Sequence, residues 1–255
     1  MAAEAEHERS PSSAGWADDA RARLYDSGVN RAFYHRAMAR LLDGVPELAG
    51  AGLDLGCGTG FSTEVLLARF PSVSWQGIDR SSAMLALAGR KTLLRPARLR
   101  EGRAEALPFA EHSFDVVVAN FAWHWFGKRA GSEIRRVLRP GGWLLASVPL
   151  RKHSQASGNR ALARALLADR RHFSRRGSQG LRFDDVRRLL PGPVRVVRIE
   201  SFVERESFAD GCELLDVLAS RGALAAIFGD RPPVAIVASP PVEFEWPFAV
   251  LHVQI

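Results

Sequence analysis

A glycine-rich segment is the part of this 255-residue sequence whose residue types and spacing point most directly to chemistry. Residues 53–60 read Leu-Asp-Leu-Gly-Cys-Gly-Thr-Gly, so an apolar run ends in glycines at alternate positions. Glycine lets the chain turn tightly and lets a ligand approach the backbone N–H groups. The pattern is typical of a nucleotide-binding turn between a buried strand and a helix.

Two acidic residues accompany these glycines. Asp54 lies on the predicted strand before them, and Asp79 follows Gly60 by 19 positions, at the end of the next predicted strand. An acidic residue at that second place accepts hydrogen bonds from ribose hydroxyls. The GxGxG spacing with Asp54 suits a nucleoside that carries a cationic amino-acid tail better than a pyrophosphate. The glycines alone would also fit a structural turn, but together with Asp79 they indicate a nucleoside site.

Predicted strands and helices alternate around this segment and must position it. Apolar runs of strand length occupy residues 51–55, 73–78, 98–102, 114–119 and 143–148. Helical spacing fills residues 62–70, 81–90 and 131–138 between them, and Ser81 is a candidate N-cap. This alternation predicts an α/β fold with a doubly wound, mostly parallel sheet of seven strands.

The flanking segments complete the expected organisation. Residues 16–45 have the spacing of one or two helices, which would form a lid. After Pro149 the pattern predicts helices over 161–173, 183–190 and 212–228, and strands over 194–199, 234–239 and 248–255. We therefore expect one domain over 16–255, with a helical insertion over 150–192 after the fifth strand and a disordered leader over 1–15.

Composition narrows the class of protein. The sequence is 47% hydrophobic and 25% charged, as in ordinary globular proteins, and has no apolar run long enough to cross a membrane. Its two cysteines lie far apart, so we expect neither a disulfide framework nor a metal site, and a reducing, cytoplasmic setting. The net charge of +7 would suit an acidic partner. Because the basic residues are scattered and nearly all arginine, nucleic acid is not the expected substrate.

Five blocks, in order, resemble the class I S-adenosylmethionine-dependent methyltransferases over roughly residues 24–150. They are residues 53–60, 77–79, 104–109, 113–118 and 136–142. The resemblance implies a Rossmann-like methyltransferase fold, S-adenosylmethionine as the methyl donor and S-adenosylhomocysteine as the product. The sequence has no HxxxH, CxxC or DxD cluster that would indicate a metal site, so a magnesium-dependent enzyme of the catechol type is not expected.

The resemblance also implies cofactor-binding roles, position by position. The methionine part would be bound by Asp54, Gly56, Cys57, Gly58 and Gly60, with Asp54 near the amino group. The ribose would be bound by Asp79, and the adenine would be framed by Arg80, Met84, Ala104 and Glu105. The methyl-transfer pocket would be lined by Asn120 and Phe121.

One position departs from the family pattern. The residue before Ala104 is commonly an aspartate that accepts a hydrogen bond from the adenine amino group, and here it is Arg103, which accepts none. Backbone groups can still bind the adenine, so the departure affects that contact and the expected affinity, and leaves the choice of cofactor unchanged.

Catalytic candidates are few, as methyl transfer from an activated sulfonium depends mainly on positioning and desolvation. His124, after the fourth strand, is a candidate general base, with packing between aromatic residues as the alternative. Tyr25 and Tyr34, the only tyrosines, are candidates for contact with the methyl donor or the acceptor, or else pack the lid. Cys57 sits where the loop needs a small residue and is not expected to be a nucleophile.

The nearest subfamily is the malonyl-[acyl-carrier protein] O-methyltransferase of biotin synthesis. The similarity rests on Arg23, Tyr25 and Asp26 and on residues 60–63, 120–125 and 208–222, although that subfamily typically has glutamine where His124 stands. It implies a small-molecule or carrier-bound acceptor. Arginines of the insertion would face an acidic carrier or bind a carboxylate, or simply be solvated: Arg164, Arg170, Arg171, Arg175 and Arg176.

Two other functions stay open at this stage. An RNA-modifying methyltransferase would bind with a steep salt dependence, but residues 120–123 read Asn-Phe-Ala-Trp in place of an Asn-Pro-Pro-Tyr-type motif. A protein that binds S-adenosylmethionine without transferring its methyl group would fit the Arg103 departure. The sequence gives no indication of the oligomeric state.

Overall fold

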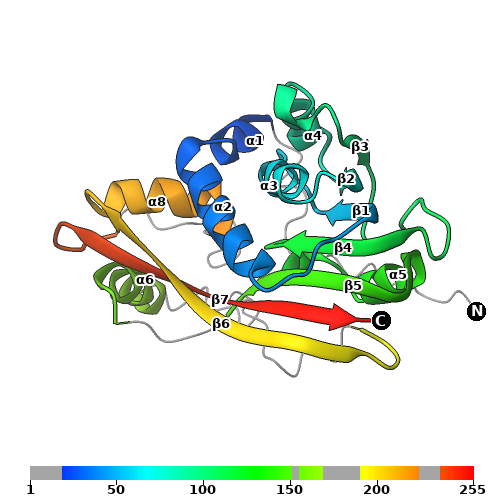
Figure 1. Cartoon of the computed structure of the whole chain (residues 1–255). Helices are drawn as coiled ribbons and strands as arrows, with labels where there is room; N and C mark the ends of the chain where they lie inside the picture. The colour runs from blue at the N-terminus through cyan, green and yellow to red at the C-terminus, as the bar shows by residue number, and fades with distance from the viewer. Residues whose placement is uncertain (1–18, 151–154, 169–189, 224–235) are drawn as a thin grey trace, which may run out of the picture.

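The computed structural model describes residues 19–150, 155–168, 190–223 and 236–255, which contain a seven-stranded sheet with helices on both faces (Figure 1). The strand order is β3-β2-β1-β4-β5-β7-β6, with β1 to β5 parallel and β7 antiparallel to both of its neighbours. The strands are β1 Gly50–Leu55, β2 Val73–Asp79, β3 Arg98–Glu101, β4 Phe114–Asn120, β5 Leu138–Pro149, β6 Arg195–Phe208 and β7 Val242–Gln254. The predicted doubly wound, mostly parallel, Rossmann-like sheet is confirmed.

The helices of the described residues are α1 Asp19–Tyr25, α2 Gly28–Leu42, α3 Phe61–Arg69, α4 Ser82–Ala88, α5 Ala130–Val137, α6 Ser157–Ala168 and α8 Gly211–Ser220, with short 3₁₀ turns at Thr92–Leu94 and Trp123–Trp125. Side-chain caps begin three of these helices, α2, α4 and α8. The Ser27 hydroxyl accepts from Asn30 N at the start of α2, and Ser81 accepts from Met84 N at the start of α4, as predicted for Ser81. Asp210 caps α8 in the same way.

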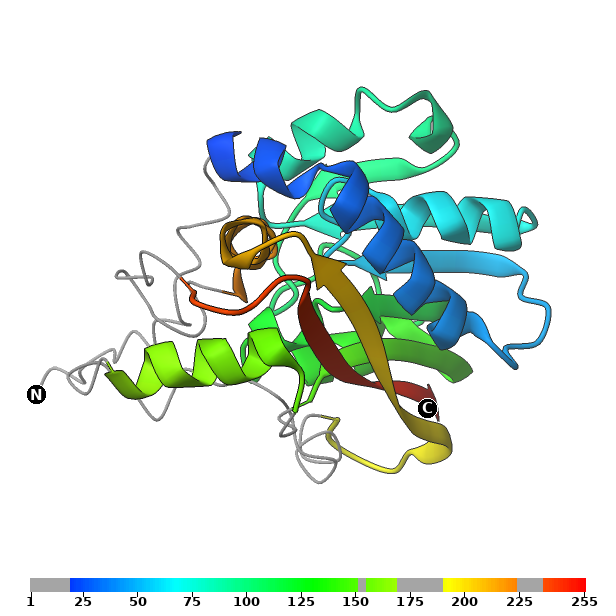
Figure 2. The same cartoon turned by 90° about the vertical axis from the view of Figure 1, so that its left-hand side faces the viewer.

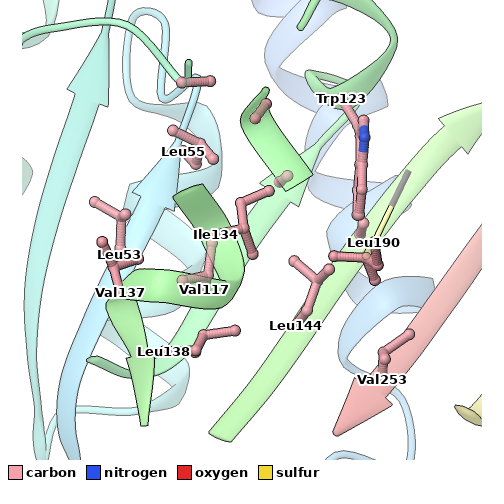
Figure 3. Packing of buried hydrophobic residues seen from close by; sticks show 14 of the residues in the cluster. Leu53, Leu55, Val117, Trp123, Ile134, Val137, Leu138, Leu144, Leu190 and Val253 are labelled. Atoms are coloured by element: carbon pink, nitrogen blue, oxygen red, sulfur yellow. The ribbon is translucent and has the colours of Figure 1, made fainter. Parts of the chain in front are cut away.

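Each face of the sheet buries its own apolar cluster. On one face α5 packs Ile134 and Val137 against β1 and β4, through Leu53 and Val117 (Figure 3). On the opposite face α2 and α3 pack against β2 and β4, whose side chains there include Trp75, Val116 and Val118. Because β4 is covered on both faces, Val116, Val117, Val118 and Ala119 are all fully buried. The central strands are therefore rigid supports for the loops at their carboxyl ends.

The β6–β7 ribbon extends beyond the rest of the sheet. β7 pairs with β6 along 242–254, whereas β5 pairs only with its second half, from Phe248 to Gln254. The projecting half, together with α6 and α8, holds a separate apolar cluster that includes Leu162, Leu214, Leu218 and Phe244. Figure 2 shows α6 and α8 lying against this part of the ribbon.

Several predicted boundaries beyond Pro149 were wrong. The strand expected at 194–199 continues to Phe208, and that expected at 248–255 begins already at Val242. The helix expected at 212–228 ends at Ser220, because Gly222 follows with a φ of +72°. Residues 236–239 of the expected strand 234–239 have no regular structure.

Other expectations fall partly or wholly outside the described residues. The leader over 1–15 and nearly all of the helix at 183–190 lie there, and of the insertion over 150–192 the structure describes mainly α6. The one or two helices expected over 16–45 are two, α1 and α2, and their role as a lid stays a prediction. The division into one domain stays a prediction. In the described part of the chain, no helix combines the length and the apolar character that crossing a membrane requires.

Candidate cofactor and acceptor site

The carboxyl ends of β1, β2 and β4 open onto one cavity of about 810 Å³, its open mouth included. Ligands of open α/β sheets bind at this edge. Nine of the residues assigned to the cofactor line it: Gly56, Gly58, Asp79, Arg80, Met84, Ala104, Glu105, Asn120 and Phe121. Asp54, Cys57 and Gly60 are not among the lining residues, and all three are buried.

The glycine loop requires its glycines for two separate reasons. Gly56, Gly58 and Gly60 have φ values of +77°, +55° and +91°, which disfavour any residue with a Cβ. In addition, a Cβ on Gly56 would lie 2.6 Å from Ala122 Cβ. The N–H groups of Gly56 and Cys57 both donate to the Ile78 carbonyl, so the loop is attached to the end of β2.

Asp79 connects this loop to the start of α4. Its Oδ2 accepts from Gly58 N at 2.9 Å and its Oδ1 accepts from Ser81 N at 2.9 Å. Burial raises the pKa of Asp79, and these two backbone N–H groups oppose the rise. A carboxylate oxygen has room for a second donor, so Asp79 can still accept from a ribose diol in the cavity.

Asp54 is a buried carboxylate with an incomplete set of partners. Its Oδ2 accepts from Thr63 Oγ1 at 2.6 Å, while Oδ1 is buried and has no partner among the described residues. Burial raises the pKa of Asp54 to about 7 against the opposing Thr63 bond, and Asp79 adds to the rise. A ligand ammonium group, reached directly or through water, is the kind of partner this oxygen lacks. The residues present therefore fit a nucleoside with an amino-acid tail.

Arg103 and Glu105, at the position predicted for the adenine, interact with each other. Arg103 Nε lies 3.5 Å from Glu105 Oε2, and the Arg103 side chain is 62% exposed. Glu105 Oε1 also accepts from Gly127 N at 2.6 Å, and Gly127 follows the cavity-lining Trp125 and Phe126. Glu105 thus positions a loop of the cavity wall, a role that the sequence did not indicate.

Asn120 and Phe121 are held by two serines that the sequence analysis missed. Asn120 Nδ2 donates to Ser62 Oγ at 3.0 Å, and Ser147 Oγ donates to Asn120 Oδ1 at 2.5 Å. Phe121 has a φ of +50°, uncommon for a bulky residue, and its N–H donates to Ser147 Oγ at 2.9 Å. The signal for Ser147 was a lone hydroxyl within the apolar strand 143–148.

The lid helices contribute two phenols to the cavity. Tyr25, at the end of α1, and Tyr34, on α2, have ring centroids 5.3 Å apart, and their side chains hydrogen-bond to each other. Burial raises the pKa of both hydroxyls, so both stay protonated near neutral pH. The Tyr25 ring also lies within 3.7 Å of the Cβ position of Gly58, so the lid reaches the glycine loop.

His124 stands apart from this cavity. It lies on the turn Trp123–Trp125 and is not among the lining residues, and its ring packs 4.8 Å from that of Trp125. Burial lowers the pKa of His124 to about 3, which makes it a weak proton acceptor. Its role as a base stays a prediction. Burial likewise raises the pKa of the Cys57 thiol well above its usual value.

Two further features bear on the chemistry of the site. Within the part of the chain that the structure describes, no group of three His, Cys, Asp or Glu side chains could hold a metal ion. Arg221, just after α8, lines the cavity, and the sequence analysis did not single it out as a site residue. No local pattern indicates its place in the cavity, because it is held there through Asn30, 191 positions away in the chain.

Comparison with known proteins agrees with this geometry. Residues 53–146 match the family model described as "Methyltransferase domain". The malonyl-[acyl-carrier protein] O-methyltransferase of Methylococcus capsulatus is 42% identical over 98 residues, which are 37% of this chain and 36% of that protein. The trans-aconitate 2-methyltransferase of Deinococcus radiodurans is 40% identical over 116 residues, 44% of this chain and 43% of that protein.

The matched stretch thus spans less than half the length of each of these relatives. Among solved structures, the YcgJ protein of Bacillus subtilis superposes with a TM-score of 0.57 at 16% identity, covering 86% of this chain and 98% of that one, which shows the shared fold. Over residues 53–146 the chain is thus similar to methyltransferase domains, and its fold is shared with the YcgJ structure.

Proposed function

We propose that this protein transfers a methyl group from S-adenosylmethionine to a carboxylate of a small or carrier-bound metabolite. The observation that carries the proposal is the cavity at the strand ends, where the glycine loop, Asp79 and Asn120 converge within the stretch that matches the methyltransferase family model. Free thiols at Cys57 and Cys212 fit a cytoplasmic setting.

The proposed roles follow from the positions of the side chains. S-adenosylmethionine supplies a methyl group already activated on a sulfonium, so the protein must orient and desolvate the reactants. Asp79 would bind the ribose and Asp54 the amino group, while the lid phenols Tyr25 and Tyr34 would exclude water. A carboxylate acceptor is ionised at neutral pH and needs no general base. This agrees with the position of His124 outside the cavity wall.

The chemistry of the acceptor is suggested by the relatives. Malonyl groups and trans-aconitate, named in two of them, are both carboxylic acids. On α6, Arg164 is exposed and available to an acidic carrier, whereas Arg170, Arg171, Arg175 and Arg176 lie outside the described residues. We therefore propose malonyl-carrier protein and trans-aconitate as the first acceptors to assay.

Cofactor binding is the first test. We expect S-adenosylmethionine and S-adenosylhomocysteine to bind in calorimetric titration, and Asp79→Ala to weaken both by 10-fold or more, because hydrogen bonds to a charged group are lost. Glu101→Ala is the matched control, since Glu101 is an exposed carboxylate on the neighbouring strand. Equal binding by wild type and Asp79→Ala would refute the assigned site.

Release of S-adenosylhomocysteine with each acceptor then tests the reaction. A protein that binds the cofactor yet releases no S-adenosylhomocysteine with any acceptor would be a binding protein without methyl transfer. An RNA-modifying enzyme would instead bind RNA with an affinity that falls steeply as salt is raised. No feature of the described residues favours either alternative over carboxylate methylation.

A further inference from the structure

Arg221 is a buried cation in the wall of the cavity. Its side chain is only 3% exposed, whereas the other two arginines of the wall, Arg80 and Arg103, are exposed. The Arg221 guanidinium carbon lies 4.1 Å from the ring centroid of Phe33 and 4.6 Å from that of Trp246. Aromatic faces attract a cation, and their apolar surroundings strengthen its interaction with any anion that enters the cavity.

The hydrogen bonds of Arg221 hold its guanidinium in place and use three of its five N–H groups. Its Nε donates to Asn30 Oδ1 at 2.9 Å, and its two terminal nitrogens donate to Glu206 at 2.5 and 3.0 Å. A guanidinium has five N–H groups, so two remain without an acceptor among the described residues. The indole N–H of Trp246 is also buried without a partner among these residues. Donors therefore outnumber acceptors at this place.

Glu206 does not neutralise Arg221 alone. Its Oε1 also lies 3.2 Å from Arg36, which in turn contacts Glu204 at 3.2 Å. Arg40 lies 3.8 Å from the same Glu204. Three guanidinium groups thus share two carboxylates, and Glu206 is divided between Arg221 and Arg36. Of the three arginines only Arg221 is buried, since Arg36 and Arg40 are about half exposed to solvent.

Arg221 and the glycine loop have different neighbours around the two phenols. Tyr25 lies 3.7 Å from the Cβ position of Gly58, on the side of the glycine loop. Arg221 instead packs against Phe33 and Trp246 and bonds to Asn30, and none of these three residues is assigned to the cofactor. The Arg221 charge also acts to lower the pKa of Tyr34.

We propose that Arg221 binds a carboxylate of the methyl acceptor and so restricts the enzyme to acidic substrates. The proposal rests on the proposed function, since it names the acceptor side of the same cavity. The two remaining N–H groups of a planar guanidinium suit a carboxylate held by charge-assisted hydrogen bonds. Asn30 and Glu206 would be positioning residues, because they act on the acceptor only through Arg221.

The experiment measures binding of trans-aconitate and of malonyl-carrier protein to protein saturated with S-adenosylhomocysteine. We expect Arg221→Met to weaken the binding of both acids by about 10- to 100-fold and to leave the S-adenosylhomocysteine affinity unchanged. Arg221→Lys should fall between, because it keeps the charge and loses the planar fork. Glu206→Gln should tighten acid binding several-fold, since it removes a competing negative charge.

The control is Arg205→Met, because Arg205 lies on the same strand as Glu206, is 75% exposed and pairs with Glu245. It should change neither affinity. Thermal unfolding of every variant separates loss of fold from loss of binding. If Arg221→Met does not fold, Glu206→Gln still tests the proposal, because it should bind the acids more tightly than wild type does.

Three outcomes would overturn the proposal. In the first, Arg221→Met weakens S-adenosylhomocysteine but not 5′-methylthioadenosine, which would assign Arg221 to the methionine carboxylate of the cofactor. In the second, Arg221→Met binds both acids as wild type does and is only less stable. In the third, the wild type binds S-adenosylhomocysteine but neither acid. Wild-type protein that binds no S-adenosylhomocysteine would instead refute the proposed function itself.

Discussion

Replacing Asp54 by asparagine should make the cofactor-free protein more stable at pH 8 and weaken its hold on the cofactor. Burial raises the pKa of Asp54 to about 7 in the folded protein, from an ordinary 3.8. The folded state therefore binds a proton more tightly than the unfolded state between about pH 4 and 7. Stability falls as pH rises through this window and is level above it. Asparagine removes the charge and still offers an oxygen to Thr63.

The size of the effect follows from the two pKa values. A separation of roughly three pH units at about 1.4 kcal/mol per unit gives an upper bound of about 4 kcal/mol above pH 7. Partial relaxation around the charge makes about 2 kcal/mol a realistic gain for Asp54→Asn at pH 8. For a domain of this size that corresponds to a rise in Tm of about 4–8 °C.

Ligand binding should also depend on pH, because it requires the ionised form of Asp54. Suppose that an ammonium group binds only the ionised form of Asp54. With a pKa of about 7, Asp54 is ionised in about one molecule in eleven at pH 6 and in about ten in eleven at pH 8. The affinity for S-adenosylhomocysteine should therefore rise about tenfold between these pH values. That for 5′-methylthioadenosine, which lacks the amino group, should stay level. Calorimetric titration and thermal unfolding from pH 5 to 8.5 measure both effects.

Asp115→Asn is the matched control, because the pKa of Asp115 is shifted in the opposite direction to that of Asp54. The pKa of Asp115 is lowered. Partial burial acts to raise this pKa, but the hydrogen bonds from the Ala51 N–H and the Arg139 guanidinium outweigh it. Its stabilisation is present above the ordinary pKa and is lost only as pH falls below it. Asp115→Asn should thus lower Tm by the same amount throughout pH 5 to 8.5. The reasoning on Asp54 fails if Asp54→Asn shifts Tm equally at pH 5 and 8.5, and S-adenosylhomocysteine binds equally at pH 6 and 8.

Two further predictions concern the glycine loop and the thiols. Gly60→Ala should lower the free energy of unfolding by about 1–2 kcal/mol from its φ of +91° and by a further 1–3 kcal/mol from contact with the buried Leu94, 2.2 Å from the new Cβ. Gly141→Ala, with a φ of +80° and open space around it, should show only the first part in denaturant unfolding, and equal losses would refute the packing contribution. A thiol reagent should modify one cysteine in the folded protein, the exposed Cys212, and reach the buried Cys57 only on unfolding. Rapid labelling that persists in Cys212→Ser would contradict this.

The parts of the fold that the sequence predicted are those with strong local signals. β4 is a run of valines buried on both faces, and the glycine loop has three positive φ values that favour glycine at those positions. Ser81 caps α4 through its own hydroxyl. Each of these features depends on neighbours within a few positions, so the sequence contains the information in readable form.

The ribbon strands were harder to predict. The exposed Arg205 lies between the half-buried Glu204 and Glu206, so both faces of β6 carry charged residues here and the sequence has no apolar–polar alternation. Glu204 and Glu206 pair with α2 through Arg36, which no local pattern reveals. The sequence analysis therefore ended this strand nine residues early.

The acceptor side of the cavity could not be predicted for the same reason. Asn30 and Arg221 are 191 positions apart in the chain and meet through a buried hydrogen bond. Ser220, beside Arg221, accepts a second bond from the Asn30 side chain. These contacts form because α8 packs against α2. Contacts between residues so far apart in the chain produce no periodic pattern in the sequence.

The separate apolar cluster of the β6–β7 ribbon allows this part of the chain to evolve independently of the glycine loop. The cluster holds α6, α8 and the projecting strands together without sharing side chains with the clusters on the two faces of the sheet. Substitutions there can reshape the acceptor side while the packing under the glycine loop stays intact. Selection for a new acceptor can therefore act on one half of the molecule, which agrees with a family match confined to residues 53–146.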